Sequence, residues 1–401
     1  MEKIIIISGF ILMIIGIYLI YTILKIFIFS PETYTNLVKA PPIFPLVPYF
    51  TEIFKIQILP PFYFTYWIII IAIASISHEF FHGIFFKKEN VRIKSTGFAF
   101  LGPFLAAFVD PEEKDIKKMK NSKQLAATAA GTFANLIVGI FFIFISVIFI
   151  HLTFTPMGAT ITGYGGSYIN VSSIDKITNN TFIIDNLELI EIKANNKSYF
   201  IDNSTLKKIL ENNISIIPVL EDSPALKNKL RGYIIEINGE KIKDSKELEK
   251  ILKNYSPGEK IKIKTLYNNT IEDYEIILAN HPLNSTKPYI GISSYQIKSN
   301  FISKIIYSLI PFIDYKPKFA HNLILFIKNL LFWIILINIG MAFFNMVPCS
   351  VLDGGRFFYV SILILTKSKK FAEKFYKIVS SLILFIFLVI TFIWFFISFF
   401  K

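Results

Sequence analysis

The pentapeptide His78-Glu79-Phe80-Phe81-His82 carries the residue types of a hydrolytic metal site. Histidines at positions i and i+4 lie on one face of a helix, one turn apart. Two imidazole nitrogens at that spacing can bind one zinc ion, and the neighbouring carboxylate of Glu79 could take a proton from water that the metal activates. The alternative interpretation is two histidines and a glutamate that pair with one another at a helix end.

The setting of the pentapeptide favours the metal site. It lies at the end of an apolar run, residues 62–86, which is long enough to cross a membrane. Ionisable groups at membrane depth are costly to place, and by default they are functional candidates.

Composition places the chain among polytopic membrane proteins. Of its 401 residues 53% are hydrophobic, and the hydrophobicity is clustered. The formal net charge is +13, which in a membrane protein favours loops that face anionic lipid, and no nucleic-acid-binding module is evident. We therefore expect the lipid bilayer and not nucleic acid as a partner. The single cysteine, Cys349, excludes an internal disulfide and a metal site built from several cysteines.

The apolar runs predict five or six transmembrane helices. A sixth run, residues 357–366, is short, and lysines follow it. If this run crosses the membrane, those lysines lie outside, against the positive-inside rule; if it does not, there are five spans and the side of the C-terminus stays open. The five long runs are residues 4–29, 62–86, 125–150, 323–346 and 378–400.

The segments between the spans have distinct characters. Residues 31–61 are rich in proline yet apolar, which predicts an irregular segment at the membrane interface. Residues 91–111 predict a hairpin at the membrane surface, because Gly102-Pro103 interrupts an apolar run too short to span. Residues 87–123 contain nine basic and five acidic residues, which predicts a cytoplasmic location. The polar, strand-like residues 151–316 then form a soluble domain outside the cytoplasm.

A candidate third ligand lies far along the chain from the histidines. Pro348 should end the fourth helix just after Asn345, and Asp353 then falls at membrane depth. A catalytic zinc ion bound by two histidines needs a third protein ligand, for which an isolated carboxylate is the natural candidate. The alternative is an aspartate that caps a helix, consistent with the glycines that follow. Asn135, in the third span, needs either a helix–helix hydrogen bond or a role at the site.

Taken together, these residues resemble the site-2 protease family of intramembrane zinc metalloproteases. The resemblance rests on His78–His82, on Gly131-Thr-Phe-Ala-Asn135, and on the Asn345 to Gly354 stretch Asn-x-x-Pro-x-x-x-Leu-Asp-Gly. Residues 216–280 resemble a PDZ domain, with Leu220-Glu-Asp-Ser-Pro-Ala225 before Gly232 to Ile242. The implied fold class is a polytopic α-helical membrane protein with a soluble mixed α/β PDZ-like domain inserted after the third span.

The resemblance implies roles for individual residues. His78, His82 and Asp353 would bind one Zn²⁺ per chain, and Glu79 would be the catalytic acid and base. Asn135 and Asn345 would lie near the scissile bond. We further predict that the hairpin offers a strand edge, at Gly97, Phe98 and Gly102, to an unwound substrate.

The implied function is hydrolysis of peptide bonds in or near transmembrane segments of other proteins, after a prior cut. The PDZ-like domain would filter substrates or bind peptide C-termini. The expected location is the plasma membrane of a prokaryote, with the active site toward the cytoplasm and the PDZ-like domain outside. Two alternatives remain open: a membrane-anchored zinc protease that cuts extramembrane segments, and a non-catalytic PDZ membrane scaffold.

One division of the chain follows from these predictions. The predicted parts are a first transmembrane helix (1–30), the interfacial segment (31–61), a catalytic core with the hairpin and third span (62–150), the PDZ-like domain (151–316) and a C-terminal membrane core with the aspartate motif (317–401).

Overall fold

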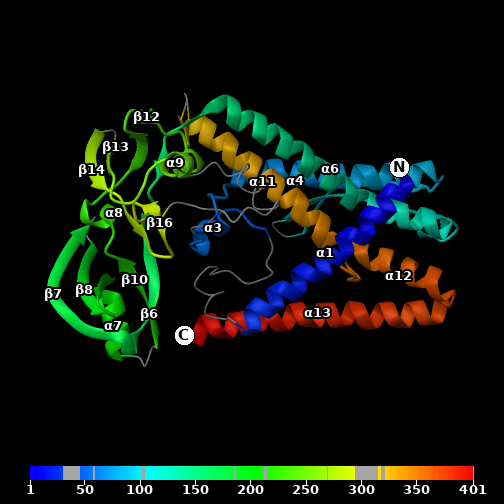
Figure 1. Ribbon diagram of the computed structural model, residues 1–401. Coiled ribbons are helices and arrows are strands. Elements are labelled where there is room, and N and C mark those ends of the chain that lie inside the picture. The colour runs from blue at the N-terminus through cyan, green and yellow to red at the C-terminus, as the bar shows by residue number, and fades with distance from the viewer. Residues whose placement is uncertain are drawn as a thin grey trace. The chain divides into compact units, whose positions relative to one another are not determined.

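The computed structural model forms two compact units, one of residues 1–149 and 322–401 and the other of residues 150–321. We call them the helical unit and the β unit (Figure 1). The structure describes residues 1–29, 46–56, 59–101, 104–184, 187–211, 215–268, 270–293, 315–317 and 321–400. Most of the predicted interfacial segment 31–61, and Gly102 of the predicted strand edge, lie outside the described residues.

Within the described residues, five helices of the helical unit are long and apolar enough to cross a membrane. The predicted polytopic architecture is thereby confirmed, with five spans. The short sixth run belongs to α12 (Asp353–Thr366), whose 14 residues reach roughly 21 Å at 1.5 Å per residue and fall short of the bilayer core. The five are α1 (Glu2–Phe29), α4 (Phe64–Lys88), α6 (Asn121–Thr153), α11 (His321–Asn345) and α13 (Lys369–Phe400).

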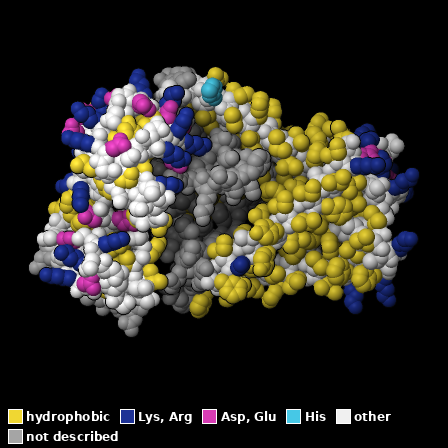
Figure 2. Space-filling view, in the orientation of Figure 1, with side chains coloured by type: hydrophobic (Ala, Val, Ile, Leu, Met, Phe, Trp, Pro, Cys, Tyr) yellow, Lys and Arg dark blue, Asp and Glu magenta, His cyan; other side chains and the backbone are white. Residues whose placement is uncertain are grey.

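The helical unit is apolar outside as well as inside. Hydrophobic side chains cover much of its visible face, and Lys and Arg gather mainly at one end (Figure 2). The interior depends on small residues of α6: Ala126, Ala129, Ala130 and Ala134 are buried, so neighbouring helices approach closely. The α6 helix is therefore a central element of the unit, sharing one apolar cluster with residues of α1, α4, α11 and α12.

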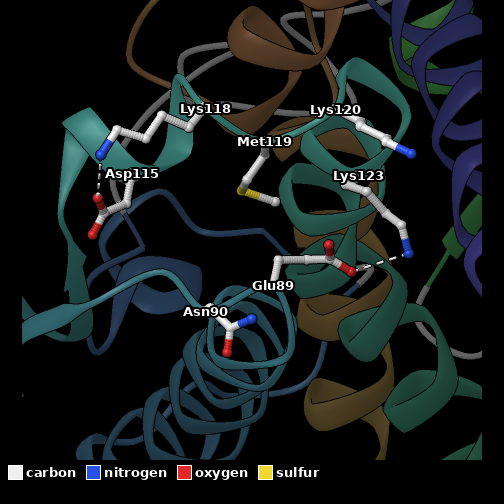
Figure 3. A pocket seen from close by; sticks show the side chains of 7 residues that line it. All are labelled: Glu89, Asn90, Asp115, Lys118, Met119, Lys120 and Lys123. Carbon is white, nitrogen blue, oxygen red and sulfur yellow. Dashed lines mark hydrogen bonds and ion pairs between the residues drawn. The ribbon is translucent and has the colours of Figure 1, made fainter.

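Charged residues join three helix ends at the basic end of the unit. The carboxylate of Glu2 in α1 accepts hydrogen bonds from Lys123 Nζ at 2.7 and 2.8 Å and from Lys88 Nζ at 2.5 Å. Lys123 also pairs with Glu89, at 3.0 Å, across a cavity of about 390 Å³ (Figure 3). The short helix α5 (Glu113–Ile116) lies beside it, and its Asp115 pairs with Lys118. These pairs fix the ends of α1, α4 and α6 relative to one another.

The predicted hairpin is present between α4 and α6. Strand β1 (Ile93–Leu101) pairs antiparallel with β2 (Phe104–Pro111), with Phe98 opposite Ala107 and Thr96 opposite Val109. Val109 packs against α4, since a methyl group placed on Gly83 would lie 3.8 Å from its side chain. The hairpin therefore runs beside the helix that carries the two histidines.

The β unit contains two larger sheets, with strand orders β6-β10-β9-β8-β7 and β12-β11-β13-β14. The second sheet packs with α9 (Ser245–Leu252) around Ile234, Ile261 and Leu248. Strand β11 of this sheet is followed by a turn at Asn238-Gly239, where φ is 47° and 88°. The likeness to a PDZ domain stays a prediction. The segment between β6 and β10 adds strands β7 to β9 and α7.

The remaining elements have the following bounds. They are α3 (Phe50–Ile53), β3 (Phe154–Pro156), β4 (Ala159–Thr160), β5 (Gly163–Tyr164), β6 (Gly166–Asn170), η1 (Val171–Ser173), β7 (Ile174–Ile184), β8 (Leu187–Ala194), β9 (Lys197–Asp202), α7 (Asn203–Glu211), β10 (Ile216–Glu221), α8 (Pro224–Lys227), β11 (Tyr233–Ile237), β12 (Glu240–Lys241), β13 (Lys260–Tyr267), β14 (Thr270–Ile277), β15 (Ala279–His281), β16 (Asn284–Tyr289), β17 (Ile292–Ser293) and β18 (Tyr315–Pro317).

Because α12 is too short to cross, the turn between α12 and α13 should lie on the same side of the membrane as residues 87–123. We expect cysteines introduced at the exposed Lys118 and Lys369 to react with a membrane-impermeant maleimide from one side only, the same for both. The natural Cys349 is buried and gives little background. A cysteine at Lys253 should react from the other side, because α6 lies between it and Lys118. Labelling of Lys118→Cys and Lys369→Cys from opposite sides would mean that α12 crosses.

Candidate metal centre

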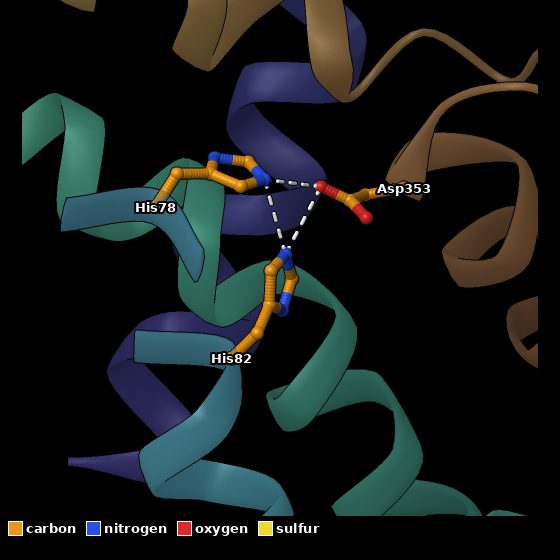
Figure 4. Close-up of side chains that lie close together, drawn as sticks. All are labelled: His78, His82 and Asp353. Carbon is orange, nitrogen blue, oxygen red and sulfur yellow. Dashed lines mark hydrogen bonds and ion pairs between the residues drawn. The ribbon is translucent and has the colours of Figure 1, made fainter. Parts of the chain in front are cut away.

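The two histidines of α4 present their Nε2 atoms to a common point. His78 and His82 are each 6% exposed, and their Nε2 atoms lie 3.1 Å apart. Both rings project from consecutive turns of the helix toward Asp353 (Figure 4). The arrangement is the one predicted from the i, i+4 spacing.

Asp353 reaches the histidines from the start of α12. Helix α11 ends at Asn345, three residues before Pro348, as predicted, and a short loop leads to Asp353, the first residue of α12. Oδ2 of Asp353 lies 2.9 Å from Nε2 of His78 and 3.2 Å from Nε2 of His82. Gly354 and Gly355 let α12 begin against the backbone of that loop, because a methyl group at either position would overlap Met346 or Cys349.

The outer nitrogens of both rings have partners on α6. Nδ1 of His82 lies 2.8 Å from the carbonyl oxygen of Ala127. A carbonyl only accepts, so Nδ1 carries the proton and donates it, and the neutral ring keeps a lone pair on Nε2. Nδ1 of His78 lies 3.2 Å from the side-chain amide of Asn135. Both Nε2 atoms are thereby directed at Asp353.

The donor set fits a metal ion. With Nδ1 of His82 protonated, its Nε2 lone pair faces a carboxylate oxygen at 3.2 Å and a second imidazole nitrogen at 3.1 Å. Electron-rich atoms that converge in this way need either a shared proton or a metal cation between them. Tetrahedral zinc with bonds of about 2.0–2.2 Å separates its ligand atoms by roughly 3.4 Å, close to the separations here. Among the described residues, His78, His82 and Asp353 form a group that could hold a metal ion.

Gly131 makes room for the rings. A methyl group at this position of α6 would lie 2.7 Å from Nε2 and Cδ2 of His78 and would overlap Nε2 of His82. No side chain larger than hydrogen fits between α6 and the ligands. Glycine in this motif therefore allows a close approach between α6 and the candidate metal centre.

Glu79 faces a different neighbour from the histidines. Successive helical residues point about 100° apart, so the side chain next to His78 turns away from α6. Oε2 of Glu79 accepts a hydrogen bond from the backbone N–H of Val109 in β2, at 2.9 Å. Of the two residues between the ligands, Phe80 is 62% exposed and Phe81 packs against the core, in accord with roles in packing or lipid contact.

The other predicted site residues differ in burial and in their position relative to the two histidines. Asn135 is fully buried beside His78. Asn345 is half-buried at the end of α11. Gly97 and Phe98 lie in β1, and Phe98 is 57% exposed. The carbonyl of Ala127 and the N–H of Val109 were not predicted, because every residue type offers these backbone groups and only the fold shows which ones meet a side chain.

Comparison with known proteins agrees with this geometry. A family model described as peptidase family M50 matches residues 66–390, which include all three ligand candidates. The chain belongs to peptidase family M50. This is the site-2 protease family, whose members are zinc metalloendopeptidases, so the predicted family is confirmed. The M50 chain is also 25% identical over 289 residues to an uncharacterized protein of Methanocaldococcus jannaschii; the match covers 72% of this chain and 54% of that protein.

Gly131 provides a direct test of the centre. We expect Gly131→Ala to lower the zinc affinity of the purified protein by at least about tenfold, because the added methyl group displaces His78 and His82. Gly340→Ala, in α11, is the matched control, since no described atom lies within 4 Å of a methyl group placed there. Metal content and competition with a chelator measure the difference. Equal zinc affinity in the two variants would show that the ligands do not need the space at Gly131.

Proposed function

We propose that the protein is an intramembrane zinc metalloprotease that hydrolyses peptide bonds in or near transmembrane segments of other membrane proteins. The observation that carries the proposal is the convergence of His78, His82 and Asp353 from two apolar segments, with Glu79 beside them. His78, His82 and Asp353 would hold one Zn²⁺, which when bound polarises the scissile carbonyl and activates the attacking water.

Glu79 is proposed as the acid and base. Its carboxylate takes the proton of the attacking water and returns it to the leaving amine. The hydrogen bond from Val109 N–H holds one carboxylate oxygen, Oε2, while Oε1 can take the proton. A base fixed by the backbone of β2 keeps one orientation through both transfers. Asn345, half-buried at the end of α11, is proposed to position the substrate.

A transmembrane substrate must unwind before it can be cut, and each backbone group left unpaired in lipid costs several kcal/mol. The hairpin can supply partners by β-addition. Because Val109 N–H points away from β1 toward Glu79, the alternation of an antiparallel pair turns the N–H groups of Ala107 and Phe98 outward too, on opposite edges.

Of the two outer edges, that of β2 is the better placed to hold a substrate near Glu79. Neighbouring strands lie about 4.8 Å apart, so a substrate on the outer edge of β1 would have β2 between itself and Glu79. A substrate on the outer edge of β2 would lie on the side that Glu79 contacts, next to α4, which packs against this strand at Val109. We therefore favour Ala107 over the sequence-predicted edge at Gly97 and Phe98 as the strand that receives the substrate.

The proposed orientation of the chain in the membrane follows from the charge of its loops. Residues 87–123 and the lysines that begin α13 are proposed to face the cytoplasm, because both are basic. The active site then lies toward the cytoplasmic side and the β unit lies outside. We propose that the PDZ-like part of the β unit reads new peptide C-termini or excludes substrates that have not yet been shortened. The alternatives, cutting of extramembrane segments or a non-catalytic scaffold, make different predictions for the experiment that follows.

Replacement of Glu79 tests the enzyme assignment. We expect Glu79→Gln to keep bound zinc and to lose at least about 100-fold in cleavage of a model transmembrane substrate, because the amide cannot take a proton. Glu89→Gln, at the end of the same helix, should cleave normally. Chelation of the metal should abolish cleavage in both the parent and the control.

Product masses from the same reaction locate the cut. A cut inside the apolar segment agrees with intramembrane proteolysis, whereas a cut outside it favours the membrane-anchored alternative. Cleavage retained in Glu79→Gln would remove Glu79 from its role. A parent protein that binds zinc without cleaving any substrate offered would favour the scaffold.

A pair of proline substitutions tests the strand edge. We expect Ala107→Pro to raise KM or lower turnover by about tenfold with zinc content unchanged, because it removes an outward donor without breaking the β1–β2 ladder. Phe98→Pro makes the same change directly across the hairpin and should have little effect. The reverse pattern would move the substrate to β1. Normal cleavage in both variants would exclude β-addition at these positions.

A further inference from the structure

We infer that Asn135 is a positioning residue for His78: its side-chain amide, with Ser77 behind it, accepts the proton that Nδ1 must carry when the ring binds metal through Nε2. The inference rests on the proposed function, since it concerns how His78 is prepared as a ligand. It differs from the predicted role of Asn135 near the scissile bond.

The contacts of Asn135 lie entirely within the protein. Its side chain is 0% exposed in α6, and one end of the amide, Nδ2, lies 3.2 Å from Nδ1 of His78. The other end, Oδ1, lies 3.3 Å from Oγ of Ser77. Both ends of the amide are thus occupied by partners on α4. A substrate carbonyl could not reach the amide without displacing them, which argues against a direct role in binding substrate.

The position of the proton on the His78 ring determines how the Asn135 amide must be oriented when a metal is bound. A neutral imidazole that binds metal through Nε2 carries its proton on Nδ1, and that N–H needs an acceptor. A half-turn of the amide exchanges Oδ1 and Nδ2 at the same two positions. Oδ1 then accepts from His78, and Nδ2 donates to Ser77.

Ser77 can take that hydrogen bond because its own proton goes elsewhere. Its Oγ lies 2.8 Å from the carbonyl oxygen of Ile73, to which it donates, so its lone pairs remain for Nδ2 of Asn135. Each hydrogen along the path from His78 through Asn135 and Ser77 to Ile73 then has one acceptor. The opposite amide orientation makes Nδ1 an acceptor and places the ring proton on Nε2, where it blocks metal binding.

His82 shows by contrast why the amide matters. The carbonyl of Ala127 can only accept, so it fixes the tautomer of His82 that binds metal. The partner of His78 is an amide, which can serve either tautomer: Nε2–H donating to Asp353 when no metal is bound, or Nδ1–H when metal is bound. A carboxylate at position 135 would serve only the second, and a leucine neither.

Zinc affinity of purified full-length variants tests the inference. We expect Asn135→Leu to bind zinc 10–100-fold more weakly than the parent, and Asn135→Asp to bind within about threefold of the parent or more tightly, since a carboxylate accepts from Nδ1–H. Ser77→Ala should weaken binding by a few-fold. Ser75→Ala is its matched control, because Ser75 Oγ donates to Ile71 in the same way, at 2.6 Å, and should bind normally.

Two further readouts separate positioning from other roles. The visible spectrum of bound Co²⁺ should change in Asn135→Leu, where His78 is misdirected, and match the parent in Asn135→Asp. Parent-like zinc affinity and Co²⁺ spectrum in Asn135→Leu would overturn the inference. Zinc affinity unchanged in every variant, with cleavage lost in Asn135→Asp, would instead assign the amide to substrate. A parent protein that binds no zinc would overturn the proposed function together with this inference. If Asn135→Leu does not fold, the zinc affinities of Asn135→Asp, Ser77→Ala and Ser75→Ala still test the inference.

Discussion

The convergence of three electron-rich atoms in its interior is the constraint that the helical unit must satisfy. Two imidazole nitrogens and a carboxylate oxygen lie within 3.2 Å of one another in a buried setting. Such a group needs a metal cation or a shared proton at its centre, and its outer hydrogen-bonding groups must be paired. The chain meets the second requirement through α6, which contributes no ligand.

A single stripe of α6 performs three tasks. Ala127, Gly131 and Asn135 are spaced four residues apart, so they lie along one face of the helix, as the two histidines do on α4. Their contributions are a carbonyl for His82, space for both rings, and an amide for His78. A slip of one residue between the helices would remove all three at once. The close packing of small residues around this stripe is therefore part of the chemistry as well as of the fold.

The sequence predicts the candidate ligands more readily than the groups that support them, for a physical reason. Ionisable groups in apolar runs are costly to place and are by default functional candidates, and this holds for His78, His82 and Asp353. The five spans are predictable because length and hydropathy define them, whereas the number of residues in 357–366 alone could not decide whether that run crosses. Ala127 and Val109 act through backbone atoms, and Ser77 resembles Ser75 until the neighbouring helix is known. The type of Asn135 predicts that it needs a partner, but an amide both donates and accepts, so its role stays open until the neighbouring side chains are known.

The position of Glu79 links the metal centre to substrate recognition. It follows His78 directly, so α4 sets the proposed ligand and the proposed base about 100° apart: one faces α6 and the other faces β2. The Val109 N–H that holds Glu79 belongs to the same strand edge that is proposed to receive the unwound substrate. Base and scissile bond would then be placed by one element, and any shift of β2 would move both together. Such coupling would keep the separation between the base and the scissile bond constant.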